Sequence, residues 1–437
     1  MKDDRFETED GAPAGREKQK NLRKRMGFTL LALFLLAGAF LAGWFGRYGA
    51  IDPRMRRLMW ALDTIKDNYY EEPDLDGIYD DLFAALTPDD YSRYYSKTEY
   101  DAVLRESDGQ NTGIGVTLLS GADDSVRLYR VRGNSPADLA GLQWGMYVYG
   151  YGNDAESLRT GGAAELLDFL NSSTGDVCLR CGYDEASAKN FTVRRASYAA
   201  TYCHYRDSEA AYAFRGENGL VLVDVTESYG TLTGADDKTA YIRIDSFTAN
   251  VAEEFRRCLV KMKERGRTDL VLDLRMNGGG YMDRLTAIAS HLMKTAPKRA
   301  IVATARYRGG KSEDFLAFGC DYASYFAEGS RVKVLADENT ASASEALIGA
   351  MLDYGTIGYG DIFLRESSGK TYGKGIMQSS FTDSKGNVMK LTVATIHWPL
   401  TNVCIQERGI RVQDGAIAVD APLIWGKDDT MLAFALS

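Results

Sequence analysis

Hydrophobic positions after residue 46 first follow the spacing of an amphipathic helix. Apolar residues recur three or four positions apart at Leu58, Leu62 and Ile65, and a second run of this kind ends just before Pro88. We therefore predict a small helical cap over residues 47–107.

Residues 108–196 change to short alternating runs that are separated by glycine and proline. The predicted strands include Val126–Val131, Val177–Cys181 and Phe191–Arg195, and short helices are predicted at 136–140 and 161–170. Short strands with two helices in about ninety residues indicate a small β-rich module.

From residue 197 onward strands and helices alternate, which is typical of an α/β core. The predicted elements are a strand at 240–244, an amphipathic helix at 251–264, a buried strand at 269–275 that leads into a glycine-rich turn and a helix, and a strand at 332–335. This order also suggests a phosphate-binding loop. A P-loop, however, needs a glycine five residues before its Gly-Lys-Ser/Thr, and the two candidates carry Ala305 and Leu364 there, which disfavours a nucleotide-binding domain.

Residues 27–46 form a run of twenty residues without a charge, which is long enough to cross a hydrocarbon core as one helix. Basic residues are concentrated in the preceding tail, residues 1–26, so the positive-inside rule places this tail in the cytoplasm and everything after Arg47 outside. We expect a single-pass anchor in a bacterial cell membrane and an extracytoplasmic catalytic part. A cleaved signal peptide is the alternative, although the apolar run is long for one.

The net charge of −9, with no basic stripe beyond residue 60, argues against a nucleic-acid binder. Six cysteines in 437 residues do not make a disulfide framework. Cys178 and Cys181 form a CxxC, but no second pair supports a zinc site, so two strand residues packed on a sheet are favoured. We expect no metal, nucleotide or other cofactor.

A serine and a lysine in the α/β core have the setting of a catalytic pair. Ser342 lies between a predicted strand and a helix, where free backbone N–H groups can stabilise a developing oxyanion. Lys374 is flanked by Gly373 and Gly375, and a desolvated lysine can act as a base toward serine. An ordinary helix-capping serine and a lysine in a surface loop would give the same two patterns. Other parts of the sequence are therefore needed to distinguish a catalytic pair from these structural roles.

The β-rich module resembles a PDZ domain. Ser135–Gly145 matches the signature SPA-x-x-AGL-x-x-G, and Gly113-Ile114-Gly115-Val116 would be the carboxylate-binding loop. Such a loop offers unpaired N–H groups to the terminal carboxylate of another chain, beside an open strand edge. Met146 stands where the signature usually carries an acidic residue.

The second half resembles the carboxyl-terminal processing proteases, also called tail-specific proteases, of the S41 serine peptidases. The resemblance rests on four blocks in the family's order: Tyr241–Phe247 (YIRIDSF), Asp273–Gly280 (DLRMNGGG), Thr340–Ala346 (TASASEA) and Gly373–Gln378 (GKGIMQ). The cap and the PDZ-like module also stand in the family's order, so the resemblance covers nearly everything beyond residue 52.

This resemblance implies a role for each matching residue. Ser342 would be the nucleophile, Lys374 the general base, and Gln378 would orient the lysine. The oxyanion hole would use the backbone N–H groups of Ala343 and of a glycine in the loop that follows Asn277, with Gly279 in first place and Gly280 beside it. A Ser–Lys mechanism needs no histidine, and among the three histidines only His204 would merit a check.

Two features depart from the family's pattern. Ser342 and Lys374 are 32 residues apart, and the extra residues, 361–371, bring a rival base, Lys370; the spacing to Gln378 favours Lys374. Gly278 replaces the usual proline, and glycine would loosen the loop and make the oxyanion hole conditional on activation.

Together these features predict a multi-domain α/β protein with an N-terminal transmembrane helix, a helical cap, a PDZ domain at 108–196 and an α/β serine protease core of the ClpP/crotonase type at 197–437. We expect an endopeptidase that uses a Ser–Lys dyad on protein substrates and recognises their C-terminal tails through the PDZ domain. The family's dimers make the cap a candidate interface for a homodimer. The alternative is a catalytically degenerate, PDZ-containing binding or regulatory protein.

Overall fold

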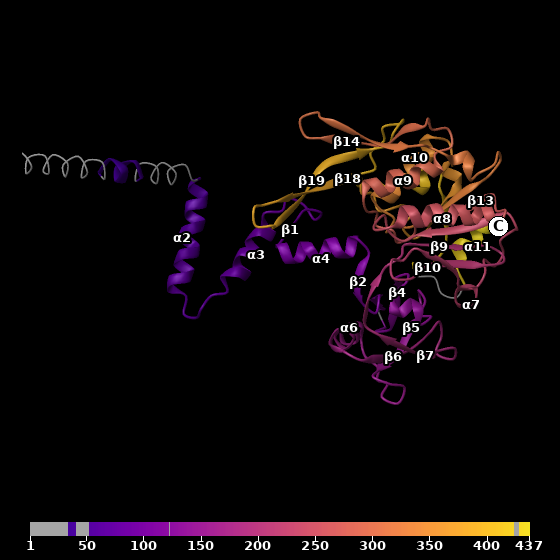
Figure 1. Cartoon of the computed structure of the whole chain (residues 1–437), viewed down its shortest axis with the longest axis horizontal. Coiled ribbons are helices and arrows are strands. Elements are labelled where there is room, and N and C mark those ends of the chain that lie inside the picture. The colour runs from indigo at the N-terminus through magenta and orange to yellow at the C-terminus, as the bar shows by residue number, and fades with distance from the viewer. Residues whose placement is uncertain (1–33, 41–51, 122, 424–427) are drawn as a thin grey trace, which may run out of the picture. The chain divides into compact units, whose positions relative to one another are not determined.

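A computed structural model of the chain describes residues 34–40, 52–121, 123–423 and 428–437 (Figure 1). These residues belong to two compact units, one that ends at Leu86 and one that starts at Thr87. Residues 34–40 are helical, and no helix in the described ranges is long and apolar enough to cross a membrane. The rest of the predicted anchor at 27–46 lies outside these ranges, so the anchor stays a prediction.

The first unit contains the helices α2 (Pro53–Asn68) and α3 (Leu75–Ala85), as the helical spacing predicts. Each begins at an aspartate whose side chain accepts a hydrogen bond from a first-turn N–H group: Asp52 from Arg54, and Asp74 from Gly77. Neither helix has a buried residue.

The second part of the predicted cap, from Thr87 on, is built into the larger unit. The short strand β1 (Arg93–Tyr95) pairs antiparallel with β19 (Val388–His397), and the helix α4 (Lys97–Ser107) follows. Ser96 and Glu99 form a capping box that fixes the start of α4.

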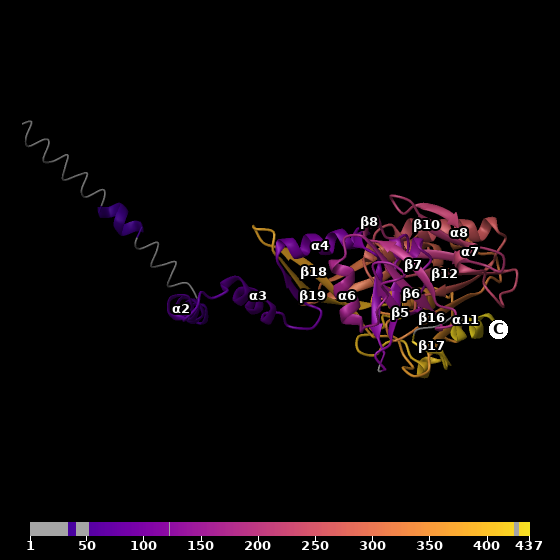
Figure 2. The same cartoon turned by 90° about the horizontal axis from the view of Figure 1, so that it is seen from below.

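The β-rich module is a five-stranded antiparallel sheet in the order β3-β4-β5-β6-β7, part of which is labelled in Figure 2. Its elements are β3 (Val116–Ser120), β4 (Val126–Val131), α5 (Pro136–Leu139), β5 (Tyr147–Gly152), α6 (Ala163–Ser172), β6 (Asp176–Gly182) and β7 (Lys189–Arg194). A two-stranded ribbon of β2 (Gln110–Gly113) and β8 (Ala196–Ala199) joins it to the rest of the chain. Cys178 and Cys181 are buried residues of β6, as expected for strand residues.

The core is an eight-stranded sheet in the order β11-β10-β9-β12-β13-β16-β17-β20. Three of its strands, β9, β10 and β13, are labelled in Figure 1. Its strands are β9 (Cys203–Arg206), β10 (Ala211–Arg215), β11 (Val221–Asp224), β12 (Thr239–Ile244), β13 (Asp269–Asp273), β16 (Val332–Ala336), β17 (Ile362–Arg365) and β20 (Ile417–Val419). The five strands from β12 to β20 are parallel, and β9 to β11 extend the sheet antiparallel. The sequence therefore predicted an α/β core correctly.

Helices cover both faces of the parallel part of this sheet. The major hydrophobic core joins one face to α8 (Val251–Glu264), α9 (Met282–Leu292) and α10 (Ala343–Asp353). The opposite face packs against α11 (Thr430–Leu436). The short helix α7 (Thr226–Tyr229) follows β11, and 3-10 turns lie at Tyr322–Ser324, Tyr359–Asp361 and Val412–Asp414.

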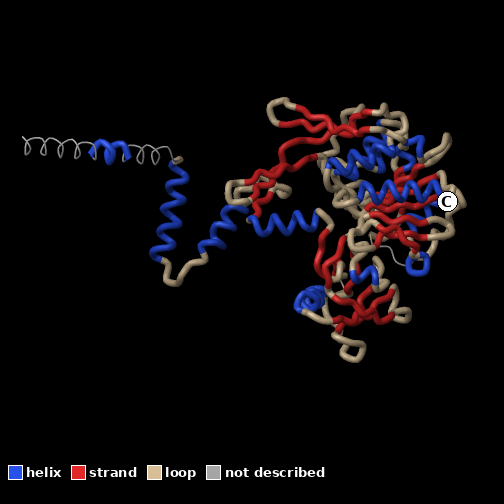
Figure 3. The backbone as a smooth tube through the Cα atoms, in the orientation of Figure 1, coloured by secondary structure: helices blue, strands red, loops and turns tan. Residues whose placement is uncertain are grey.

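A second sheet carries the segment that follows the glycine-flanked lysine. Long hairpins, seen in red in Figure 3, are formed by β14 (Arg299–Tyr307) with β15 (Ser312–Phe318) and by β18 (Ile376–Thr382) with β19. The stretch 361–371, which the sequence suggested to be extra residues near the site, is only partly a loop. Its residues 362–365 are strand β17, whose first three side chains are buried in the core sheet.

Candidate active site

Ser342 lies at the turn between β16 and α10, where it is the residue that caps the helix. Its backbone has φ 56° and ψ −114°, a conformation that residues other than glycine rarely adopt. The side chain is half-buried. This sharp strand-to-helix turn gives Ser342 the setting that the sequence predicted for a nucleophile.

The buried carboxylate of Glu345 joins Ser342 to the lysine segment. Its Oε2 accepts hydrogen bonds from the backbone N–H groups of Ser342 and of Lys374, both 2.9 Å long. Its Oε1 accepts one from Gly373 N–H at 2.8 Å and one from Thr371 Oγ1 at 2.6 Å. Burial raises the pKa of this carboxyl, although the hydrogen bonds oppose the shift. Sequence reasoning missed Glu345, which the spacing Ser-x-x-Glu of a capping box could have indicated.

Lys374 enters the site at the start of the second sheet, two residues before β18. Its side chain is half-buried, and its Nζ lies 4.8 Å from the centre of the Tyr91 ring. Burial lowers the pKa of this lysine, the ammonium of Lys390 lowers it further, and Asp89 opposes both. Within the described residues Nζ makes no hydrogen bond with Ser342 Oγ.

The other predicted side chains near the lysine have separate partners. Gln378 donates from Nε2 to Thr392 Oγ1 across the β18–β19 pair, at 3.1 Å, so in this conformation its amide is directed to β19. Lys370 is exposed and lies in an isolated bridge with Arg411. Of the two lysines, only Lys374 is both partly buried and tied to the Ser342 turn.

The loop 276–280 lies against the Ser342 turn. A Cβ on Gly279 would come within 2.8 Å of Ser342 Cβ and of Ala343 N, and its φ of 99° also favours glycine. Gly279 N–H donates to Asn277 Oδ1 at 2.9 Å, so this amide is engaged within the loop. Among the described residues, the N–H groups of Gly280 and Ala343 have no acceptor. The N–H group of Gly278 in the same loop also has no acceptor among these residues, so Gly278, Gly280 and Ala343 are the candidate donors for an oxyanion.

Asn277 anchors this loop despite the glycine at position 278. Its buried side chain donates to the carbonyl of Ile244 at 2.8 Å. Its own carbonyl accepts from Ala341 N–H and from Ser344 Oγ, both at 3.0 Å. The loosening expected from Gly278 is therefore offset by hydrogen bonds to both neighbouring segments.

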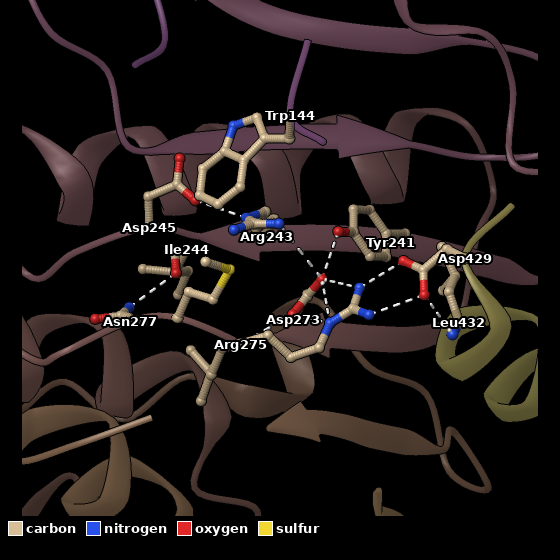
Figure 4. A network of polar contacts seen from close by, with 12 residues as sticks. Trp144, Tyr241, Arg243, Ile244, Asp245, Asp273, Arg275, Asn277, Asp429 and Leu432 are labelled. Atoms are coloured by element: carbon tan, nitrogen blue, oxygen red, sulfur yellow. Dashed lines mark hydrogen bonds and ion pairs between the residues drawn. The ribbon is translucent and has the colours of Figure 1, made fainter. Parts of the chain in front are cut away.

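The β-rich module also contacts this loop. Arg130 of β4 donates from Nη2 to the carbonyl oxygen of Met276 at 2.7 Å. The ring of Trp144, from the same module, lies 3.9 Å from the guanidinium carbon of Arg243 on β12 (Figure 4). The module is thus bonded directly to the segment that precedes Asn277.

Buried charges continue from Arg243 toward the C-terminus (Figure 4). Arg243 pairs with Asp245 at 2.6 Å and lies 4.0 Å from Asp273. Arg275 bonds Asp273 and, through two nitrogens, Asp429 at the start of α11. These pairs fix the backbone just before the loop 276–280 on the face of the sheet opposite to α8, α9 and α10.

Among the described residues, no histidine is hydrogen-bonded to Ser342, Glu345 or Lys374. His291 bonds Asp321, and His397 bonds Thr395 and the carbonyl of Asn402. His204 lies between aromatic rings, and burial lowers its pKa to about 4.

The predicted carboxylate-binding loop connects β2 to β3. The carbonyl oxygens of Ile114 and Gly115 accept hydrogen bonds from Ala137 and Arg132, whereas their N–H groups make none with other described residues. Val116 begins β3, an edge strand that pairs only with β4 in the five-stranded sheet. The loop thus offers N–H groups without an acceptor beside an open strand edge.

Comparison with known proteins shows which family and which proteases this chain resembles. Residues 238–413, which contain Ser342 and Lys374, match Peptidase family S41. The chain is 28% identical to a carboxyl-terminal-processing protease of Picosynechococcus over 72% of this chain and 67% of the relative. It is 24% identical to a probable CtpA-like serine protease of Staphylococcus haemolyticus over 77% of this chain, but it spans only 60% of that relative.

The fold is also that of a solved structure of this class. A putative S41 protease of Bacteroides fragilis superposes with a TM-score of 0.50 at 18% identity and covers 86% of this chain and 96% of that one. The resemblance to the carboxyl-terminal processing proteases of family S41 is therefore confirmed.

Proposed function

We propose that the chain is a serine endopeptidase with Ser342 as nucleophile and Lys374 as general base. The observation that carries the proposal is the Glu345 carboxylate, which bonds the backbone of both residues at 2.9 Å. The S41 match of residues 238–413 and the names of the relatives, which describe proteases, support it.

In the proposed reaction, neutral Lys374 takes the hydroxyl proton of Ser342 as Oγ attacks a peptide carbonyl. The N–H groups of Ala343 and of a glycine in the loop, Gly280 or a reoriented Gly279, would bind the oxyanion. Lys374 would then give its proton to the leaving amine, and water would hydrolyse the acyl-enzyme. Gln378 would orient the lysine once its amide turns from Thr392.

The proposal includes recognition of substrate tails by the PDZ-like module. The N–H groups of Ile114 and Gly115 would bind a terminal carboxylate, and the tail would extend along the open edge of β3. A peptide with a free C-terminus should then bind at least tenfold more tightly than its amidated form. We further propose that residues 27–46 anchor the chain, with the catalytic part on the extracytoplasmic side of a bacterial membrane and the cap as a dimer interface.

A second candidate is a PDZ-containing binding protein whose peptidase core is inactive. It is favoured by one observation: in the described part of the chain, the side chains of Ser342 and Lys374 make no hydrogen bond with each other. Catalytic contacts of this kind are often long before substrate binds, so an active peptidase is also compatible with this geometry.

The test is cleavage of an unstructured protein by the full-length chain, compared with Ser342→Ala, Lys374→Ala and Lys370→Ala. Loss of cleavage in the first two variants and its retention in the third would establish the proposed dyad. Loss in Lys370→Ala alone would move the base to the exposed lysine. A parent that neither cleaves protein nor reacts with a fluorophosphonate at Ser342, with and without a tail peptide, would favour the binding protein.

A further inference from the structure

The ammonium of Lys374 is held by an aromatic ring from a distant part of the chain. Nζ lies 4.8 Å from the ring centre of Tyr91, a distance at which a cation is attracted to the ring face. In the described part of the chain, Nζ is not hydrogen-bonded to Ser342 or to Gln378. The lysine therefore rests on Tyr91 rather than on its proposed catalytic partner.

Tyr91 belongs to a short strap, residues 89–92, that is firmly docked on the site. Asp89 Oδ1 accepts hydrogen bonds from the N–H groups of Tyr91 at 2.9 Å and Ser92 at 2.7 Å. Ser92 Oγ in turn accepts from Thr392 N–H on β19 at 3.1 Å. The Tyr91 hydroxyl lies 3.1 Å from that of Tyr372, two residues before the lysine. The ring position is thus fixed by both neighbouring segments.

The groups that face Lys374 act on its charge in opposite directions. Burial and the nearby Lys390 ammonium of β19 favour the neutral amine, which a general base requires. The Asp89 carboxylate of the strap favours the ammonium. The ring of Tyr91 also favours the ammonium, because the attraction acts only on the charged form. Tyr91 is itself uncharged at neutral pH, since its hydrogen bond to Tyr372 and burial raise the pKa of Tyr91 to about 12.

We propose that Tyr91 is a positioning residue that holds the Lys374 ammonium away from Ser342 in the resting enzyme, so that the lysine must leave the ring before the dyad can close. This inference rests on the proposed function. The strap lies near the start of the larger unit and leads into β1, which pairs with β19. Under this proposal, the start of the larger unit therefore restrains the general base.

The test compares the full-length parent with Tyr91→Leu, which keeps an apolar cover but removes the ring, and with Tyr91→Phe, which keeps the ring. Tyr91→Met provides a second ring-free variant if the leucine variant loses its cooperative thermal transition. One readout is the rate of Ser342 acylation by a fluorophosphonate between pH 5 and pH 10. The other is NMR titration of ¹³C-labelled lysine, with the Lys374 signal assigned by its loss in Lys374→Arg.

In Tyr91→Leu we expect the acid limb of the acylation profile and the NMR midpoint to move to lower pH by about 0.5–1 unit. Acylation at pH 7 should rise by about three- to tenfold, and Tyr91→Phe should match the parent within about twofold. Slower acylation in Tyr91→Leu at every pH, with an unchanged NMR midpoint, would overturn the inference, because the ring would then support the active position. If neither parent nor variants are acylated, the proposed peptidase fails; the NMR midpoint then decides alone whether the ring holds the ammonium.

Discussion

Arg130 donates a hydrogen bond of 2.7 Å to the carbonyl oxygen of Met276. Met276 is a buried residue with a φ of 61°, so its backbone is in a conformation that needs support from its surroundings. Its N–H group is bonded to Asp337. The Arg130 bond therefore fixes the first peptide of the loop that carries the proposed oxyanion donors.

Replacing Arg130 with methionine should slow acylation of Ser342 about tenfold, because a charge-assisted hydrogen bond to the loop is lost. Arg132→Met is the matched control, since Arg132 lies on the same module but bonds Glu106. Fluorophosphonate labelling, with circular dichroism to verify folding, measures the effect. Equal rates in the two variants would show that the loop does not depend on Arg130.

Glu345→Ala should lose both activity and stability. Four donors would be left without their acceptor in a buried place, which costs about 3 kcal/mol or more of the free energy of unfolding. Acylation should fall at least a hundredfold, because Ser342 and Lys374 would lose the group that fixes their backbones. Glu345→Gln keeps the shape of the side chain and one acceptor oxygen. Its free energy of unfolding, measured by urea denaturation, should therefore decrease less than that of Glu345→Ala. A stable, active alanine variant would contradict the joining role of Glu345.

Glu254 should make stability fall as pH rises. Its carboxyl is buried in α8, and burial raises its pKa from 4.5 to about 8, although Tyr202 and Cys203 donate backbone N–H groups to it. Between these values the folded chain keeps a proton that the unfolded chain has released, so the free energy of unfolding decreases through this window and levels off above it.

Glu254→Gln cannot ionise, and its advantage over the parent should therefore grow between pH 4.5 and pH 8, to a total on the order of 4 kcal/mol. Thermal unfolding at pH 5 and at pH 8.5 measures it. A difference in Tm between variant and parent that stays constant over this range would show that Glu254 ionises normally in the folded protein.

Gly349→Ala should destabilise the core even though alanine is the better helix former. A Cβ there would lie 2.2 Å from Trp398 Nε1, so α10 or the indole must move, at a cost of about 1–3 kcal/mol. Gly360→Ala is the control, because no atom lies within 4 Å of the corresponding Cβ. A Tm of Gly349→Ala equal to that of the control would mean that the indole relaxes freely.

The local pattern of apolar and polar residues was sufficient to predict elements in which buried residues recur at regular intervals. The helix predicted at 251–264 has the same bounds as α8, because buried residues recur along one face of it. Strand β17 was not predicted. Its three buried residues stand between the charged Asp361 and Arg365, and they form a strand by pairing with β16, which is distant in sequence. A four-residue parallel strand carries too little pattern of its own.

The same distinction holds at the site. Motif and spacing indicated Ser342 and Lys374, but the contacts that place them come from Glu345 and Tyr91. The tyrosine reaches its hydroxyl partner, Tyr372, across a separation of 281 residues. No local pattern in the sequence near position 91 can indicate a partner so far along the chain.

The pairing of β1 with β19 has a consequence for how the chain can be divided. Residues 388–390 are covered by β1, whereas β14 pairs with β19 only at 394–397. A fragment that begins after Tyr95 would leave backbone donors and acceptors open along this part of β19. Such an edge is a template for strands of other molecules, so the fragment would tend to aggregate edge to edge. A fragment that keeps this edge covered therefore begins before Arg93, for example at Thr87, where the larger unit starts, and not at the first residue of the PDZ-like module.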